Sequence, residues 1–120
     1  MFGWFEKKPQ RLEPESRWTV VLSDGLISVT DEGGDTRSVA EVNLSGIAVE
    51  TNDSGPWGAD VWWLLFGSED RLECTFPQGA TGEEVLINYI TALPAFNHSA
   101  MIAAMRSTQN ATFALWRRSV

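Results

Sequence analysis

The chain of 120 residues is long enough for one folded domain with a sizeable core and too short for two independent cores. Its composition, with 43% hydrophobic and 21% charged residues, is that of a folded globule and excludes an intrinsically disordered chain. The net charge of −7 is unevenly distributed: residues 1–11 carry +2, residues 106–120 carry +3, and residues 12–105 therefore carry −12. An acidic body repels phosphate backbones, so we expect no nucleic-acid binding outside the two ends.

No apolar run approaches the roughly 20 residues that span a bilayer. Residues 1–10 lack a long apolar segment followed by a cleavage site of small residues. We therefore expect a cytoplasmic protein that is neither an integral membrane protein nor secreted with a cleaved signal. Cys74 is the only cysteine, which excludes an intrachain disulfide and a cysteine-based zinc cluster.

Residues 1–16 form an aromatic and basic arm ahead of a single domain, residues 17–120. Its aromatic and basic side chains are Phe2, Trp4, Phe5, Lys7 and Lys8. Aromatic rings favour a membrane interface and lysines favour anionic lipid, so membrane contact by this arm is one interpretation. Stable anchoring takes a second signal, such as the basic pair Arg117-Arg118. The other interpretations are that the arm folds back over the face that carries Trp62, Leu64 and Phe66, and that it is disordered.

From residue 17 to residue 76 the sequence alternates apolar and polar residues in short runs separated by turn residues, which predicts an antiparallel sheet. Asp24-Gly25 predicts a two-residue hairpin turn, and "DEGGD" and residues 67–70 predict two further turns. The six predicted strands are "RWTVVLS", "LISVT", "TRSVAEVN", "SGIAVETN", "VWWLLFG" and "RLECTF".

After Phe76 the pattern changes to that of helices. Thr81 and Glu84 fit a capping box at a helix start. Behind it Leu86, Tyr89, Ile90 and Leu93 form an apolar face, and Pro94 ends the helix. The segment "NHSAMIAAMRS" predicts a second, shorter helix that begins near Asn97 with Ile102 and Met105 facing inward. "ATFALWRR" predicts a closing strand.

The predicted fold class is α+β: an antiparallel bent sheet or partly open barrel of six to seven strands, with one main C-terminal helix and a second short helix. This layout resembles the pleckstrin-homology-like superfold. The phrases "ETNDSGPWGADVWWLLF" and "LPAFNHSAMIAAMRSTQNATFALWRR" resemble those of small bacterial proteins of unknown function. The resemblance implies a scaffold that binds peptides, lipids or partner proteins. The short helix and strand after the main helix depart from the usual layout.

A hairpin of residues 46–52 and 60–66 places Glu50 opposite Trp62 and Ala48 opposite Leu64. Pairing residues 61–66 with 71–76 places Trp63 opposite Cys74, Leu65 opposite Leu72 and Val61 opposite Phe76. Because side chains alternate with period two, both pairings predict the same core face. That face contains Ile47, Val49, Val61, Trp63, Leu65, Leu72, Cys74 and Phe76.

The opposite face carries Trp62, Leu64 and Phe66 beside Glu50, Arg71, Glu73 and Thr75. Covering each of these three large side chains is worth about 1.5–3 kcal/mol, so we expect something to cover them. The candidates are the arm, the second helix, another subunit and a ligand. Together with Trp57 at the loop tip and Asp60 at the rim, this face is the predicted interaction surface: Glu50, Trp57, Asp60, Trp62, Leu64 and Phe66.

No catalytic motif, cofactor motif or metal motif accompanies these residues. Glu50, Asp53 and Asp60 suggest a metal or acid–base site, but their spacing matches no calcium loop, and Asp53-Ser54-Gly55-Pro56 is good turn chemistry. His98 is the only histidine, and Cys74 is predicted to face inward, where a reactive thiolate is disfavoured. We therefore expect a non-enzymatic module that binds an unknown protein or a second copy of itself. The alternatives are a peripheral membrane protein and, less favoured, a carboxylate-based metal protein or enzyme.

Overall fold

A computed structural model describes residues 17–52 and 61–119 of the chain. Within these residues the fold is α+β, with two antiparallel sheets and two helices. The strands and helices are β1 (Thr19–Ser23), β2 (Leu26–Thr30), β3 (Thr36–Ala40), β4 (Gly46–Thr51), β5 (Val61–Phe66), β6 (Leu72–Pro77), α1 (Glu83–Thr91), α2 (His98–Arg106) and β7 (Ala111–Arg117). Neither described helix is long and apolar enough to cross a membrane.

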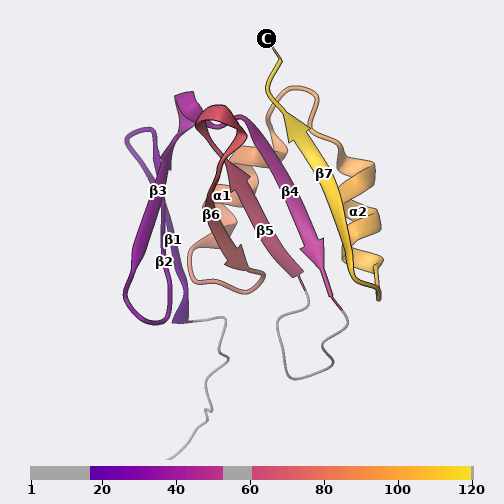
Figure 1. The fold of residues 1–120 in the computed structure, drawn as a ribbon, viewed down its shortest axis with the longest axis horizontal. Coiled ribbons are helices and arrows are strands. Elements are labelled where there is room, and N and C mark those ends of the chain that lie inside the picture. Colours follow the sequence, from indigo (N-terminus) through magenta and orange to yellow (C-terminus); the bar gives the residue numbers. More distant parts are fainter. Residues whose placement is uncertain (1–16, 53–60, 120) are drawn as a thin grey trace, which may run out of the picture.

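The two sheets lie side by side in Figure 1, with both helices behind the four-stranded sheet. The three-stranded sheet has the order β1-β2-β3, and the four-stranded sheet has the order β6-β5-β4-β7. The seven described strands thus form two separate sheets in place of the single bent sheet or partly open barrel that was predicted, and no hydrogen-bonded ladder joins these sheets among the described strands. The two helices are equal in length, nine residues each, so the expected main helix and shorter helix are not distinguished.

Both predicted turns of the three-stranded sheet are present. Asp24 and Gly25 have φ of 54° and 76°, the left-handed conformation of a tight hairpin, and they connect the paired residues Ser23 and Leu26. In the second turn the Asp31 carboxylate accepts hydrogen bonds from the backbone N–H groups of Gly33 and Asp35, at 2.9 and 3.0 Å. Local turn chemistry was thus sufficient to predict this sheet.

The predicted core face is confirmed except at one residue. Ile47, Val49, Val61, Trp63, Leu65, Cys74 and Phe76 are all buried, whereas Leu72 is 47% exposed. The predicted β5–β6 register was wrong by two residues: Trp63 pairs with Phe76 and Leu65 with Cys74. A bulge between Leu65 and Phe66 then pairs Phe66 with Leu72, which moves the Leu72 side chain to the opposite face.

Helix α1 does not begin with the predicted capping box. Its N-cap is Gly82, in the left-handed conformation with φ of 86°, and no side chain caps it. The backbone of Thr81 is instead bonded to β1, since its N–H donates to the Trp18 carbonyl and its carbonyl accepts from the Val20 N–H, each at 2.8 Å. This short parallel bridge connects the helical layer to the three-stranded sheet.

Helix α2 begins as predicted but turns a different face inward. The Asn97 side chain caps it by accepting a hydrogen bond from the Ala100 N–H at 2.9 Å. Ala104 is buried, whereas Ile102 and Met105, which were expected to face inward, are 50% and 38% exposed. Ala104 is the fully buried side chain of this helix, and Ala100 and Met101 pack partly buried against the core, whereas Ile102 and Met105 project from it into solvent.

Gly82→Ala is expected to lower the free energy of unfolding by about 2–4 kcal/mol. The substitution places a side chain at positive φ, and its Cβ would collide with the Val20 carbonyl oxygen. Gly34→Ala is the matched control, because Gly34 also has positive φ but has open space around it, so it should lose only about 1 kcal/mol. Urea denaturation of both variants measures the difference, and equal losses would contradict a steric requirement at Gly82.

Candidate binding surface

The outer face of the four-stranded sheet is the surface opposite the core and the helices. It is defined here by Trp62, Leu64 and Phe66 of β5 and their cross-strand neighbours. On β4 the register places Glu50 opposite Trp62 and Ala48 opposite Leu64, as predicted. The further neighbours are Leu72, Thr75 and Pro77 on β6, and Thr112 and Ala114 on β7.

The three large side chains of β5 on the outer face are neither free in solvent nor fully covered. Trp62, Leu64 and Phe66 are each partly buried, while the alternating residues Val61, Trp63 and Leu65 are buried. Trp18, just before β1, packs the edge of its indole against Trp62, with ring centroids 5.5 Å apart and an interplanar angle of 82°. The three-stranded sheet therefore extends the apolar surface of the outer face through one tryptophan.

Two hollows lie on this side of the molecule. The first, of about 610 Å³, lies over the four-stranded sheet, and its lining includes Glu50, Trp62, Leu64, Asn110 and Thr112. The second, of about 360 Å³, lies between the two sheets and is lined by Trp18, Val29, Asp31, Asp35, Arg37, Leu72, Glu73, Cys74 and Thr75. Leu72 and Thr75 line both hollows, which therefore adjoin at β6, and the two hollows together are called the groove below.

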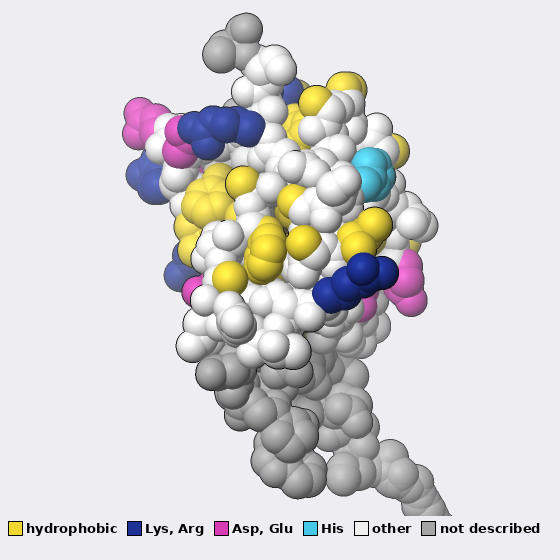
Figure 2. Space-filling model, turned by 90° about the vertical axis from the view of Figure 1, so that its right-hand side faces the viewer, with side chains coloured by type: hydrophobic (Ala, Val, Ile, Leu, Met, Phe, Trp, Pro, Cys, Tyr) yellow, Lys and Arg dark blue, Asp and Glu magenta, His cyan; other side chains and the backbone are white. Residues whose placement is uncertain are grey.

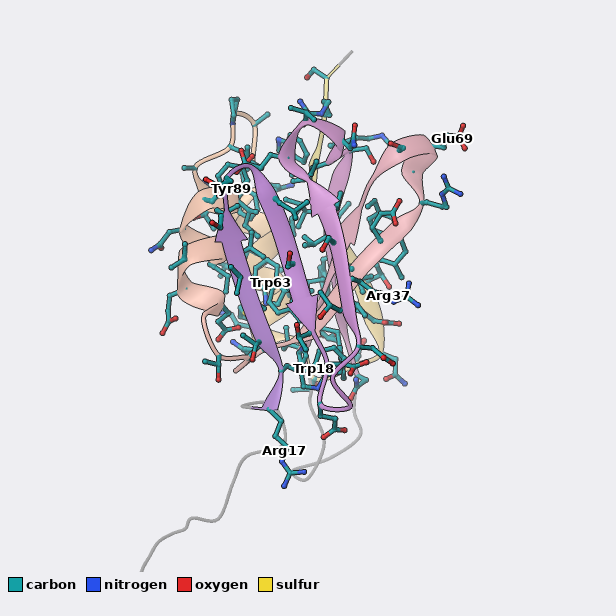
Figure 3. The ribbon with its side chains drawn as sticks, turned by 90° about the vertical axis from the view of Figure 1, so that its left-hand side faces the viewer. Arg17, Trp18, Arg37, Trp63, Glu69 and Tyr89 are labelled. Carbon is teal, nitrogen blue, oxygen red and sulfur yellow. The ribbon has the colours of Figure 1, made fainter. Side chains whose placement is uncertain are left out.

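Figure 3 looks onto the three-stranded sheet and shows Trp18 and Arg37 near its border with the β5–β6 hairpin, whose turn carries Glu69. The groove has an apolar floor and a charged rim. Glu50, Glu73, Asp31 and Asp35 supply negative charge, and Arg37 supplies one positive charge. Within residues 17–52 and 61–119, neither Glu50 nor Arg37 forms an ion pair, and Arg37 shares its hollow with the carboxylates of Asp31, Asp35 and Glu73. The rim favours a ligand with net positive charge.

The side of the molecule seen in Figure 2 carries a second gathering of hydrophobic side chains, between a group of charged side chains and the histidine. A third hollow, of about 500 Å³, lies where Phe66 meets Ala114, Trp116 and the loop before α2. This hollow is partly closed by structural contacts: the Trp116 indole N–H donates to the Pro94 carbonyl at 2.9 Å, and the Asn97 N–H donates to the Leu115 carbonyl at 2.7 Å.

Arg117 and Arg118, at the end of β7, both bind other parts of the protein. Arg117 forms an ion pair with Asp70 at 2.8 Å. The Arg118 guanidinium donates to the backbone carbonyls of Leu44 and Glu41, at 2.7 and 2.8 Å, and lies 5.5 Å from the Trp116 ring centre. Their charges therefore fasten the end of β7 to its neighbours.

Several predicted site residues lie outside the described residues: Trp57 and Asp60 of the interaction surface, Asp53 of the metal hypothesis, and Phe2, Trp4, Phe5, Lys7 and Lys8 of the arm. Of the predicted surface, the structure brings together Glu50, Trp62, Leu64 and Phe66. No group of three His, Cys, Asp or Glu side chains that could hold a metal ion occurs in the part of the chain that the structure describes.

Sequence reasoning missed Trp18 and Leu72 as members of this surface. Trp18 lies in the predicted strand "RWTVVLS", but a pattern along one strand does not indicate which other sheet a side chain contacts. Leu72 reaches the outer face only because of the β5–β6 bulge. In the sequence, Trp18 is marked only as a large side chain at the start of a predicted strand, after an aromatic-rich segment. This does not indicate which residue its ring contacts.

The two candidate reactive residues are unsuited to catalysis on the outer face. Cys74 is buried; burial, and next the neighbouring Glu73 carboxylate, raise the pKa of its thiol to about 11, against a smaller lowering by Arg37. His98 is exposed at the start of α2, where its ring packs edge-on against Phe96 at 4.9 Å between centroids. The thiol is thus protonated at neutral pH, and the imidazole lies on the helical layer.

Cys74 in the native full chain is expected to react with Ellman's reagent at pH 8 roughly 200-fold more slowly than in the unfolded chain, because a thiol pKa of about 11 leaves few thiolates. The control is Ser99→Cys, which adds an exposed thiol on α2, away from the outer face, that should react at once. A fast phase from Cys74 in the native wild type would contradict its burial.

Comparisons of the chain with known protein families, with curated proteins and with solved structures found no match. Evidence for a function must therefore come from the geometry of the described residues. The geometry identifies a groove with an aromatic floor and an acidic rim, formed by both sheets and running along the outer face.

Proposed function

We propose that this protein is a non-enzymatic binding module that holds a segment of a partner protein along the groove on its outer face. The observation that carries the proposal is that two hollows adjoin, one lined by Arg37 and Trp18 and the other by Trp62 and Leu64, with Leu72 and Thr75 in both linings. A groove of this form suits an extended or helical segment better than it suits a compact small molecule.

The chemistry of the groove specifies the segment. Partly buried Trp62 and Leu64 on the floor, with the Trp18 indole against Trp62, offer anchoring contacts for aromatic or aliphatic side chains. The rim carboxylates, of which Glu50 and Glu73 are on the four-stranded sheet, favour Lys or Arg close to those anchors. We infer that the ligand is an apolar and basic peptide segment.

The scaffold we propose is pleckstrin-homology-like: a bent pair of antiparallel sheets with helices packed on one side. The observed α+β order and the strands that follow one another through short turns support this proposal. The open border between β3 and β6 and the helix and strand after α1 are departures from it. Since a fold does not determine a function, the binding proposal rests on the groove alone.

The peripheral-membrane alternative receives less support. It requires a second signal beside the arm, and the arginines that were candidates for it are bound to Asp70 and to backbone carbonyls. An enzymatic function is less favoured as well, because the groove residues are carboxylates, amides, threonines and one arginine without a histidine or an ionised thiol beside them.

The proposal is tested by selecting peptides from a displayed random library on the full chain. The selected peptides should carry aromatic or aliphatic residues next to Lys or Arg. Their affinity should fall at least about 10-fold for Trp62→Ser/Leu64→Ser, because losing a buried anchor costs more than about 1.4 kcal/mol. Calorimetric titration measures the affinity, and circular dichroism checks that the variant is folded.

Val85→Ser/Ile102→Ser is the control, because it removes two exposed apolar side chains from the helical layer and should leave peptide affinity unchanged. Peptides that bind both double variants equally, or a selection that enriches none, would count against the groove. Light scattering completes the test: a dimer that Trp62→Ser converts into a monomer would identify the bound segment as part of a second copy.

A further inference from the structure

We propose that residues 1–16 of the same chain lie in the groove on the outer face and must be displaced by a partner segment. This inference rests on the proposed function of the groove and names its resident occupant. It makes the arm an internal competitor, which sets a threshold for binding.

The first argument is where the described chain begins. Arg17 directly precedes Trp18, whose side chain lines the groove and touches Trp62. The 16 residues before Arg17 are therefore attached next to a residue that lines the groove. Fully extended they reach about 50 Å, whereas the width from β6 to β7 is about 15 Å at the usual strand spacing, so the arm has length enough to cross the outer face.

The second argument is complementary chemistry. The arm holds three aromatic residues, Phe2, Trp4 and Phe5, followed after Glu6 by Lys7 and Lys8; residues 1–11 carry a net charge of +2, and Glu13 and Glu15 bring residues 1–16 to zero. The groove presents an apolar floor and a rim on which carboxylates outnumber basic side chains, and one of these carboxylates, Glu50, has no ion pair within the described residues. The arm thus has the pattern that the groove selects: large apolar side chains beside lysines.

The third argument is the incomplete cover of β5. Trp62, Leu64 and Phe66 are partly buried and Leu72 is 47% exposed, so a large apolar surface remains that further contacts would stabilise. Among the described residues, the helices cannot supply those contacts, because both pack behind the sheet. A segment attached at Trp18 binds this surface without the entropy cost of bringing two molecules together.

A spin label on the arm of the full chain tests the proposal. Gly3→Cys introduces an accessible thiol that can be labelled at pH 7, while Cys74 stays unlabelled because it is buried and protonated. The expected result is strong broadening of the amide signals of Glu50, Leu64, Thr75 and Thr112 on the outer face. Signals of Val85 and Ile102 on the helical layer should keep their widths.

A mixed sample separates broadening within one chain from broadening between two chains. It contains spin-labelled chains without isotope label and isotope-labelled chains without spin label. Broadening that vanishes in the mixture supports an arm bound within its own chain. Broadening that persists in the mixture would assign the groove to a second copy and overturn the proposal. Equal, weak effects on both layers of the molecule would also overturn it.

The matched variant is Phe2→Ser/Trp4→Ser/Phe5→Ser, which keeps the length and charge of the arm but removes its anchors. It should lose the broadening and bind the selected peptides about 10-fold more tightly than the wild type, because the competitor is gone. If broadening is absent but the peptides still bind at Trp62 and Leu64, the arm proposal fails and the binding function stands. If the peptides bind elsewhere, the binding function fails whatever the arm does.

Discussion

Strand β5 is apolar on both of its faces, and most of the molecule is organised around it. Its inward residues Val61, Trp63 and Leu65 are buried against the helical layer and the neighbouring strands, with Trp63 stacked on Phe76 at 6.2 Å between ring centres. Its outward residues form the floor of the groove. Because side chains along a strand alternate between its two faces, the six residues of β5 contribute both to the core and to the outer surface. A change that shifted this strand by one residue would exchange the two.

The second constraint is the junction that holds the three-stranded sheet in place. No strand ladder connects the two sheets among the described residues, so their relative position depends on Thr81 bonded to β1, on Gly82, and on the shared core. This junction brings Trp18 against Trp62 and creates the hollow between the sheets. Stability and the shape of the groove therefore depend on the same few backbone contacts.

Local signals predicted the strands, both turns of the first sheet and the Asn97 cap, because each depends on neighbouring residues. These local signals gave wrong predictions where a contact with a residue far away in the sequence determined the structure instead. Thr81 matched a capping box, but its backbone is bonded to β1 and the chain passes through Gly82 instead. In α2 the apolar residues Ile102 and Met105 were expected inside, yet close packing admits the smaller Ala104. The predicted β5–β6 register was wrong, and the bulge in this pair could not be foreseen because an alternating pattern of apolar and polar residues does not reveal a bulge.

The sequence by itself determined the α+β class, the alternation of β5 and the pairing of Glu50 with Trp62, since these follow from periodicity and turn length. It also placed Trp62, Leu64 and Phe66 on one face. Only the tertiary structure decided that Trp18 meets that face, that Leu72 joins it, and that two hollows adjoin at β6. The physical reason is that these features depend on how separate sheets pack together, and packing between distant segments is not encoded in any local pattern.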